Sequence, residues 1–184
     1  MFGEIVQVNN SSSTDTNTLQ LPWYVAHVAS RHEKQVARQL EEQRINHFLP
    51  LYRSVRRWKD RRKELEMVLF PGYIFVQLDL REKLRVLKLP GVVRFVSFGG
   101  NPAPLAEGEI NPLLQGIRAG VMAEPHPYLK VGRRVRVKHG AFKGAEGILV
   151  RRKDKFRVVL SIDLIMRSVS VEVDESDIEP SSKN

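Results

Sequence analysis

The residue pattern changes near residue 120, and this change most constrains how the chain folds. Residues 21–118 combine strand-like apolar runs with helical periodicity, whereas residues 129–180 hold short alternating runs separated by glycines. Between them, residues 119–128 are interrupted by Pro125 and Pro127, as is typical of a linker. The sequence therefore predicts two domains, 21–118 and 129–180, joined by a linker at 119–128. Residues 1–20 are polar and are expected to form a disordered tail.

The first domain is predicted to be α+β, with a mixed sheet and helices on one face. Strand-like runs alternate with helical periods in the order β-α-β-β-β-α-β-α. Ser30 followed by Glu33 matches a capping box, so the first helix is expected to begin after Ser30. The second domain has about five short strands and no long helical period, which favours a small closed β-barrel.

The composition excludes several classes of function. The 184 residues contain no cysteine, and 30 Lys and Arg oppose 21 Asp and Glu to give a formal charge of +9. Thiolate metal sites and disulfides are therefore absent, and no apolar run is long enough to span a membrane. The five histidines are scattered, and no nucleophile, phosphate-loop or metalloprotease motif is present. We expect a cytoplasmic protein that is not an enzyme and has no catalytic residue, metal or cofactor, with a polyanion as its partner.

A dense basic segment lies between residues 53 and 63. Its cations are Arg53, Arg56, Arg57, Lys59, Arg61, Arg62 and Lys63, opposed only by Asp60. A packed core cannot absorb this charge, so the segment is expected to project as a hairpin or loop. It is interpreted either as a surface that contacts nucleic-acid phosphates or as an ordinary solvated face.

Aromatic residues cluster around two other segments. Tyr73 and Phe75 follow Pro71-Gly72 and are expected on one face of a strand, whereas Phe95 and Phe98 precede Gly99-Gly100. Two interpretations are open from the pattern alone. The rings form part of the core, or they line a depression that receives the tip of a partner's helix.

Several segments resemble the NusG family of transcription elongation factors. WYVAHVASRHEKQVARQL (23–40), LFPGYIFVQL (69–78) and GVVRFVSFGGNPAP (91–104) are similar to the amino-terminal domain of that family. Residues 131–150 alternate basic and apolar residues, then turn through glycines around Phe142, and resemble its KOW motif, which forms an SH3-like barrel.

The resemblance implies a noncatalytic factor that binds bacterial RNA polymerase and suppresses pausing or termination. Its first domain would receive the polymerase clamp helices at Tyr73 and Phe75, supported by Phe95 and Phe98. Its barrel would bind ribosomal protein S10 or the termination factor Rho through Phe142 and Lys143. The family also implies a monomer that lies close to nucleic acid at the transcription bubble.

The basic segment and the FVSFGGNP stretch are similar to the specialised RfaH, UpxY and LoaP types, which are antiterminators of particular operons. However, Ala29, Gln39, Glu42 and Pro90 depart from the polar or basic residues with which RfaH types read DNA, and only Arg94 is basic. Arg94 is therefore added to the predicted nucleic-acid contacts. The alternative function is that of a ribosome-associated RNA-binding protein that uses the same barrel motif.

Overall fold

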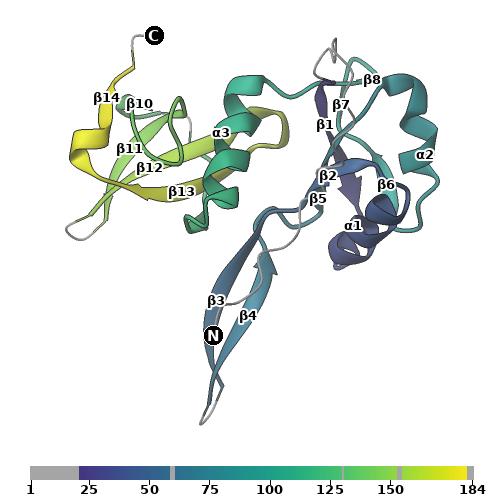
Figure 1. The fold of residues 1–184 in the computed structure, drawn as a ribbon, viewed down its shortest axis with the longest axis horizontal. Helices are drawn as coiled ribbons and strands as arrows, with labels where there is room; N and C mark the ends of the chain where they lie inside the picture. The colour runs from purple at the N-terminus through teal and green to yellow at the C-terminus, as the bar shows by residue number, and fades with distance from the viewer. Residues whose placement is uncertain (1–20, 59–60, 130, 153–154, 182–184) are drawn as a thin grey trace. The chain divides into compact units, whose positions relative to one another are not determined.

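The computed structural model describes residues 21–58, 61–129, 131–152 and 155–181 (Figure 1). The predicted tail, residues 1–20, lies outside the described residues. The chain divides into two compact units. The first contains the described residues up to Leu49 together with Pro71–Leu105, and the second contains Pro50–Phe70 and the chain from Ala106 onward. The second unit thus includes the basic segment and the helix that precedes residue 119, which differs from the expected boundaries.

The first unit is built on a four-stranded sheet in the order β2-β5-β1-β6. The strands are β1 (Trp23–Val28), β2 (Asn46–Phe48), β5 (Tyr73–Gln77) and β6 (Val92–Phe95). Its ladders are all antiparallel, although a mixed sheet was expected. The reason is that β1 lies between β5 and β6 and runs opposite to both, so the two parallel strands are never neighbours.

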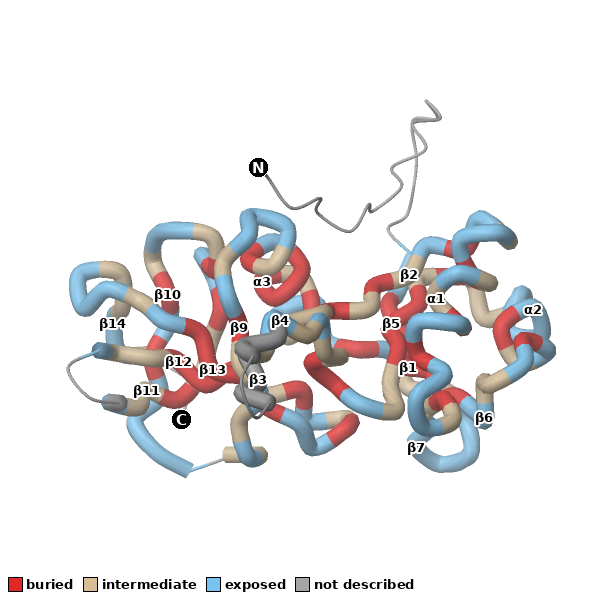
Figure 2. Tube along the Cα trace, turned by 90° about the horizontal axis from the view of Figure 1, so that it is seen from below, coloured by how far each residue is buried: buried red, intermediate tan, exposed pale blue. Residues whose placement is uncertain are grey.

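Helices α1 (Glu33–Glu42) and α2 (Lys83–Leu87) supply the core on one face of this sheet, and the 3-10 turn η1 (Leu80–Glu82) leads into α2. Val36 and Leu40 of α1 and Val86 of α2 are wholly buried against alternate residues of the strands. Apolar side chains therefore recur about every 3.6 residues along the helix and every second residue along the strands, and the two sets pack against each other in this layer. Buried residues fill β1 and β5 in Figure 2, where β7 is exposed.

Strand β6 contains a bulge. His27 pairs with Arg94, but the next residue of β1, Val28, pairs with Val92, so Val93 is an extra residue. Val93 and Arg94 are consequently both exposed, although successive residues of a regular strand face opposite sides.

Two hairpins form small two-stranded sheets of their own. Strands β3 (Leu51–Trp58) and β4 (Arg61–Val68) form a long hairpin, as expected for the basic segment. Strands β7 (Ser97–Phe98) and β8 (Asn101–Pro102) are joined by Gly99 and Gly100, whose φ angles are 58° and 85°. Positive φ at both central residues is the geometry of a type I′ turn, which glycine adopts without strain.

The second unit holds a six-stranded antiparallel sheet in the order β14-β10-β11-β12-β13-β9. Its strands are β9 (Ala123–His126), β10 (Arg134–Val137), β11 (Glu146–Arg152), β12 (Lys155–Ile162), β13 (Arg167–Val173) and β14 (Ile178–Pro180). The short turns η2 (Asp163–Ile165) and η3 (Glu175–Asp177) precede the last two strands. Five of these strands match the predicted barrel, and the sixth, β9, lies inside the predicted linker.

Strand β9 is fixed to the barrel by charge as well as by its ladder to β13. Arg157 of β12 donates to Glu124 of β9 at 2.5 Å and to Ser170 at 3.3 Å. Its side chain is only 16% exposed, so this ion pair is partly desolvated. Pro125 is tolerated because β9 is an outer strand of the sheet.

Helix α3 (Glu107–Arg118) packs against the same unit. Ile110, Leu113 and Leu114 are buried on one side of it. Gly116 allows the closest approach, because a Cβ placed there would lie 2.0 Å from Cε1 of Phe142. Phe142 belongs to the turn between β10 and β11, so α3 covers this turn.

Candidate functional site

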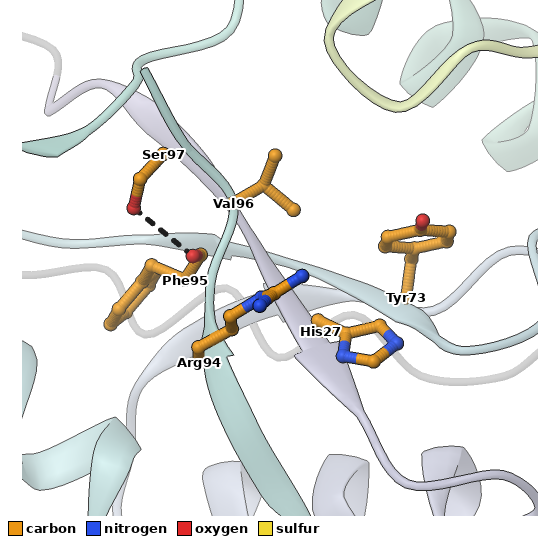
Figure 3. Close-up of a pocket in the computed structure, with 6 residues that line it drawn as sticks. All are labelled: His27, Tyr73, Arg94, Phe95, Val96 and Ser97. Atoms are coloured by element: carbon orange, nitrogen blue, oxygen red, sulfur yellow. Dashed lines mark hydrogen bonds between the residues drawn. The ribbon is translucent and has the colours of Figure 1, made fainter. Parts of the chain in front are cut away.

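A row of three side chains crosses the sheet of the first unit. His27 of β1 pairs with Tyr73 of β5 on one side and with Arg94 of β6 on the other. Cross-strand partners face the same side of a sheet, so the three lie together. The rings of His27 and Tyr73 are 5.5 Å apart, and Figure 3 shows the Arg94 side chain extending from β6 toward β1. We call these residues the Tyr73–His27–Arg94 row.

The row lines a pocket of about 410 Å³. Phe95, Val96 and Ser97 complete its lining, and the Ser97 hydroxyl donates to the Phe95 carbonyl at 3.1 Å (Figure 3). Tyr73, His27 and Val96 are half-buried, whereas Arg94 and Ser97 are exposed. Nδ1 of His27 is buried and has no hydrogen-bond partner among the described residues. The pocket therefore combines an aromatic and aliphatic wall with one exposed cation.

The turn that precedes Tyr73 is held by a buried carboxylate. Glu33 is 5% exposed, and its Oε1 accepts the Gly72 N–H at 2.8 Å, while the Gly72 carbonyl accepts from Val28 at 2.9 Å. Gly72 has a φ of 84°, which an L side chain rarely adopts. The predicted capping box is wrong: α1 begins at Glu33 with His32 as its cap residue, and no side chain caps it. The carboxylate turns instead toward the Pro71-Gly72 turn and fixes the position from which Tyr73 starts.

The four predicted aromatic contacts fall in three environments. Tyr73 is half-buried in the pocket. Phe75 is wholly buried and Phe95 is 4% exposed, so both rings belong to the packed interior. Phe98 is 86% exposed in the β7–β8 hairpin and does not line the pocket. Of the two interpretations, the depression fits Tyr73 and the core fits Phe75 and Phe95.

Sequence reasoning missed His27, Val96 and Ser97 as pocket residues and placed Arg94 among the nucleic-acid contacts. The alternation of β1 already puts His27 on the same side as Trp23 and Val25. Only the strand order brings that side next to Tyr73 and Arg94. Arg94 lies in the first unit beside His27, whereas the other predicted basic contacts that the structure describes lie in the β3–β4 hairpin of the second.

The register of that hairpin opposes like charges. Arg56 pairs with Lys63 and Arg57 pairs with Arg62, whereas Arg53 pairs with Glu66. Lys59 lies outside the described residues. Like charges directly opposite one another destabilise an antiparallel pair.

The barrel turn does not present Phe142. The ring is 3% exposed and packs against Gly116 of α3, whereas the neighbouring Lys143 is exposed. The expectation that this turn exposes the ring is not met in this structure, because α3 covers it, and a role of Phe142 in binding a partner stays a prediction. The turn itself has the predicted glycine geometry, with φ of 81° at Gly140 and 86° at Gly144.

Helix α3 also meets the barrel through an acidic pair. Desolvation by burial raises the pKa of Glu109, and the charge of Asp163 raises it further. The Asp163 backbone N–H bonds the Glu109 carboxylate and opposes part of this shift. The ionised form of Glu109 is therefore disfavoured where α3 packs on the barrel.

Within the described residues, no group of three or more histidine, aspartate or glutamate side chains is placed to hold a metal ion. The helices in this part of the chain are also too short or too polar to cross a membrane.

Comparisons with known proteins agree with the resemblance seen in the motifs. The family model described as "Transcription termination factor nusG" matches residues 21–114, just over half of the chain. The transcription termination/antitermination protein NusG of Lactococcus lactis is 36% identical over 122 residues, which cover 64% of this chain and 65% of that protein. The corresponding Pseudomonas aeruginosa protein is 29% identical over 173 residues, covering 85% and 97%. A solved structure of Thermotoga maritima NusG aligns with 89% of this chain and 99% of its own, at a TM-score of 0.51 and 24% identity, and so supports the fold.

Proposed function

This chain belongs to the NusG family of noncatalytic transcription termination and antitermination factors, and on that premise we propose that it regulates elongation by binding bacterial RNA polymerase through the Tyr73 pocket. The observation that carries the proposal is the pocket itself. It is concave, it exposes an aromatic ring and Val96, and it lies on a sheet that is rigidly packed on its other face. A hollow with an aromatic and aliphatic wall fits the tip of the polymerase clamp helices. The bound factor suppresses pausing or termination.

The experiment measures binding of the purified full chain to bacterial RNA polymerase. Tyr73→Ala removes the accessible ring, and we expect a loss of affinity of at least tenfold, of the size seen for central aromatic contacts, or about 1.4 kcal/mol. Phe98→Ala is the matched control, because it removes a more exposed ring outside the pocket. Circular dichroism verifies that each variant is folded.

A loss of affinity with Tyr73→Ala alone supports the pocket as the binding site, and a loss with each of the two variants extends the contact surface to the β7–β8 hairpin. If only Phe98→Ala lowers the affinity, or if neither variant does, the pocket is not the binding site. No binding by the wild-type chain at micromolar concentration contradicts the proposed function.

The β3–β4 hairpin is proposed to contact nucleic-acid phosphates near the transcription bubble. The like-charged register positions support this, because a phosphate backbone relieves their repulsion. Neutralising Arg56, Arg57, Arg61 and Arg62 to glutamine should lower the affinity for DNA and the slope of its salt dependence. Arg38→Gln, at an exposed position of α1 outside the predicted contacts, is the control, and an unchanged slope in the quadruple variant would contradict the contact.

The barrel is proposed to recruit a second partner, ribosomal protein S10 or Rho. In this conformation His139 and Lys143 are the exposed side chains of the β10–β11 turn, and Lys143 is the one of them that the motif predicted as a partner contact. Binding assays with each purified partner and Lys143→Glu test the proposal. An unchanged affinity for both partners would exclude a role for Lys143.

A further inference from the structure

We infer that the pocket of the first unit selects an acidic side chain of its partner, which pairs with Arg94 while a neighbouring apolar side chain packs on Tyr73 and Val96. The inference rests on the proposed function, because it specifies which residues of the polymerase the pocket receives. It also assigns Arg94 to protein recognition, in place of the nucleic-acid contact expected from the sequence.

The first observation is that the Arg94 guanidinium has no ion pair within the part of the chain that the structure describes. The pocket lining contains neither aspartate nor glutamate. Some other exposed arginines have carboxylate partners, as Arg81 has Asp79, Arg85 has Glu82 and Arg136 has Glu146. Arg94 thus offers its donors to an external group. A guanidinium matches a carboxylate geometrically, since its planar fork forms two parallel hydrogen bonds with the two oxygens.

The second observation is the spacing that the sheet imposes. Arg94 and Tyr73 flank His27 on either side, so their Cα atoms are two strand spacings apart, about 10 Å. The long Arg94 side chain extends back toward β1 and shortens this span (Figure 3). Side chains three or four positions apart on a helix lie about 5–6 Å apart at Cβ. A helix end with an apolar residue and an acidic residue at that spacing therefore reaches both ends of the row.

The third observation is the environment of the cation. Arg94 borders a wall made of Tyr73 and Val96, and a partner seated there excludes water from the ion pair. Lower hydration strengthens the attraction to a carboxylate. Phosphate recognition usually gathers several cations or backbone N–H groups, and Arg94 is the pocket's only arginine or lysine. The lining therefore favours a protein side chain over a nucleic-acid backbone.

The test measures the affinity of the full chain for bacterial RNA polymerase at low and high salt. Arg94→Gln should weaken binding about tenfold at low salt, Arg94→Lys should weaken it less, and the difference should shrink as salt rises. The matched control is Arg38→Gln, which removes the same charge from an exposed position of α1. Its affinity should stay within about twofold of wild type.

Tyr73→Ala separates this inference from the proposed function. If Tyr73→Ala weakens binding and Arg94→Gln does not, the pocket docks the polymerase but acid selection is overturned. If neither variant weakens binding, the proposed function fails with it. If Arg94→Gln lowers affinity for bubble DNA and leaves polymerase binding unchanged, Arg94 contacts nucleic acid and the inference is wrong.

A photo-crosslinking residue in place of Ser97, which is exposed at the pocket, identifies the occupant directly. Mass spectrometry of the crosslinked complex should yield a polymerase peptide with an aspartate or glutamate three or four residues from an apolar side chain. A crosslinked peptide without an acidic residue would overturn the inference.

Discussion

Tyr73 and Phe142 both lie next to a glycine turn and were both expected to meet a partner, yet only one ring is accessible. Tyr73 leaves the Pro71-Gly72 turn on a strand and stays half-buried in a pocket. Phe142 lies between Gly140 and Gly144 and is buried by α3. The local chemistry of the two turns is similar. What differs is whether an element distant in sequence covers the turn, so turn chemistry predicts backbone shape and not exposure.

Truncating the two rings should have opposite consequences. Phe142→Ala removes a buried ring and leaves a cavity beneath α3, so the free energy of unfolding should fall by about 3–5 kcal/mol. Tyr73→Ala should cost about 1 kcal/mol or less, because its ring is half-exposed. Urea denaturation of the full chain measures both. Equal losses would remove the distinction between the two turns.

The close approach of α3 can be tested with two glycines of the same helix. Gly116→Ala places a methyl group against the Phe142 ring and should destabilise the second unit by about 1–3 kcal/mol. Gly108→Ala, where no heavy atom lies within 4 Å of an added Cβ, should stabilise α3 by about 0.5–1 kcal/mol. Thermal unfolding of the two variants shows whether each substitution raises or lowers the stability of the chain. A stabilising effect at both sites would show that α3 does not press on Phe142 in solution.

The two turns should also differ in what holds them. The Phe142 turn is closed by backbone hydrogen bonds, such as Gly144 N–H to Val137 O at 2.8 Å, whereas the Tyr73 turn needs the Glu33 carboxylate. Glu33→Ala should cost about 1 kcal/mol of unfolding free energy and weaken polymerase binding, because the Gly72 N–H loses its acceptor. Glu33→Gln keeps an acceptor oxygen and should retain most of both. If alanine and glutamine behave alike, the hydrogen bond does not position the turn.

The smallest expected effect concerns pH. The raised pKa of Glu109 means that the folded chain holds this proton more tightly than the unfolded chain. The stabilisation is present below the unfolded pKa and is lost as pH rises through the folded value. Glu109→Gln should therefore flatten the decrease in the free energy of unfolding above pH 4.5, the ordinary pKa of a glutamate carboxyl. Denaturation midpoints measured on both chains from pH 4 to 7 test this, and parallel curves would contradict it.

Much of the fold was accessible from pattern. Runs of strand-forming residues predicted strands at 23–29 and 73–78, and the structure places β1 and β5 there. The glycines around Phe142 predicted a turn between two strands, which is also confirmed. These features depend on residues close in sequence, and local propensity therefore carries them.

Predicting the site required the order of the strands in the sheet, which local sequence patterns do not contain. Nothing in the sequence of β1 says that its neighbours are β5 and β6, and without that order His27, Tyr73 and Arg94 cannot be assigned to one row. Glu33 was assigned to a helix cap because its spacing from Ser30 fits one. Its carboxylate instead accepts a hydrogen bond from the backbone N–H of Gly72, 39 positions away. Long-range pairing decided both cases.

The bulge at Val93 has a consequence for self-association. β6 is an outer strand of its sheet, and a regular outer strand is a template on which the strand of another molecule can pair. The extra residue breaks the even spacing of N–H and C=O groups and increases the local twist. A second chain therefore finds no continuous ladder to extend, which protects the pocket-bearing sheet against edge-to-edge aggregation even though Val93 itself is apolar and exposed.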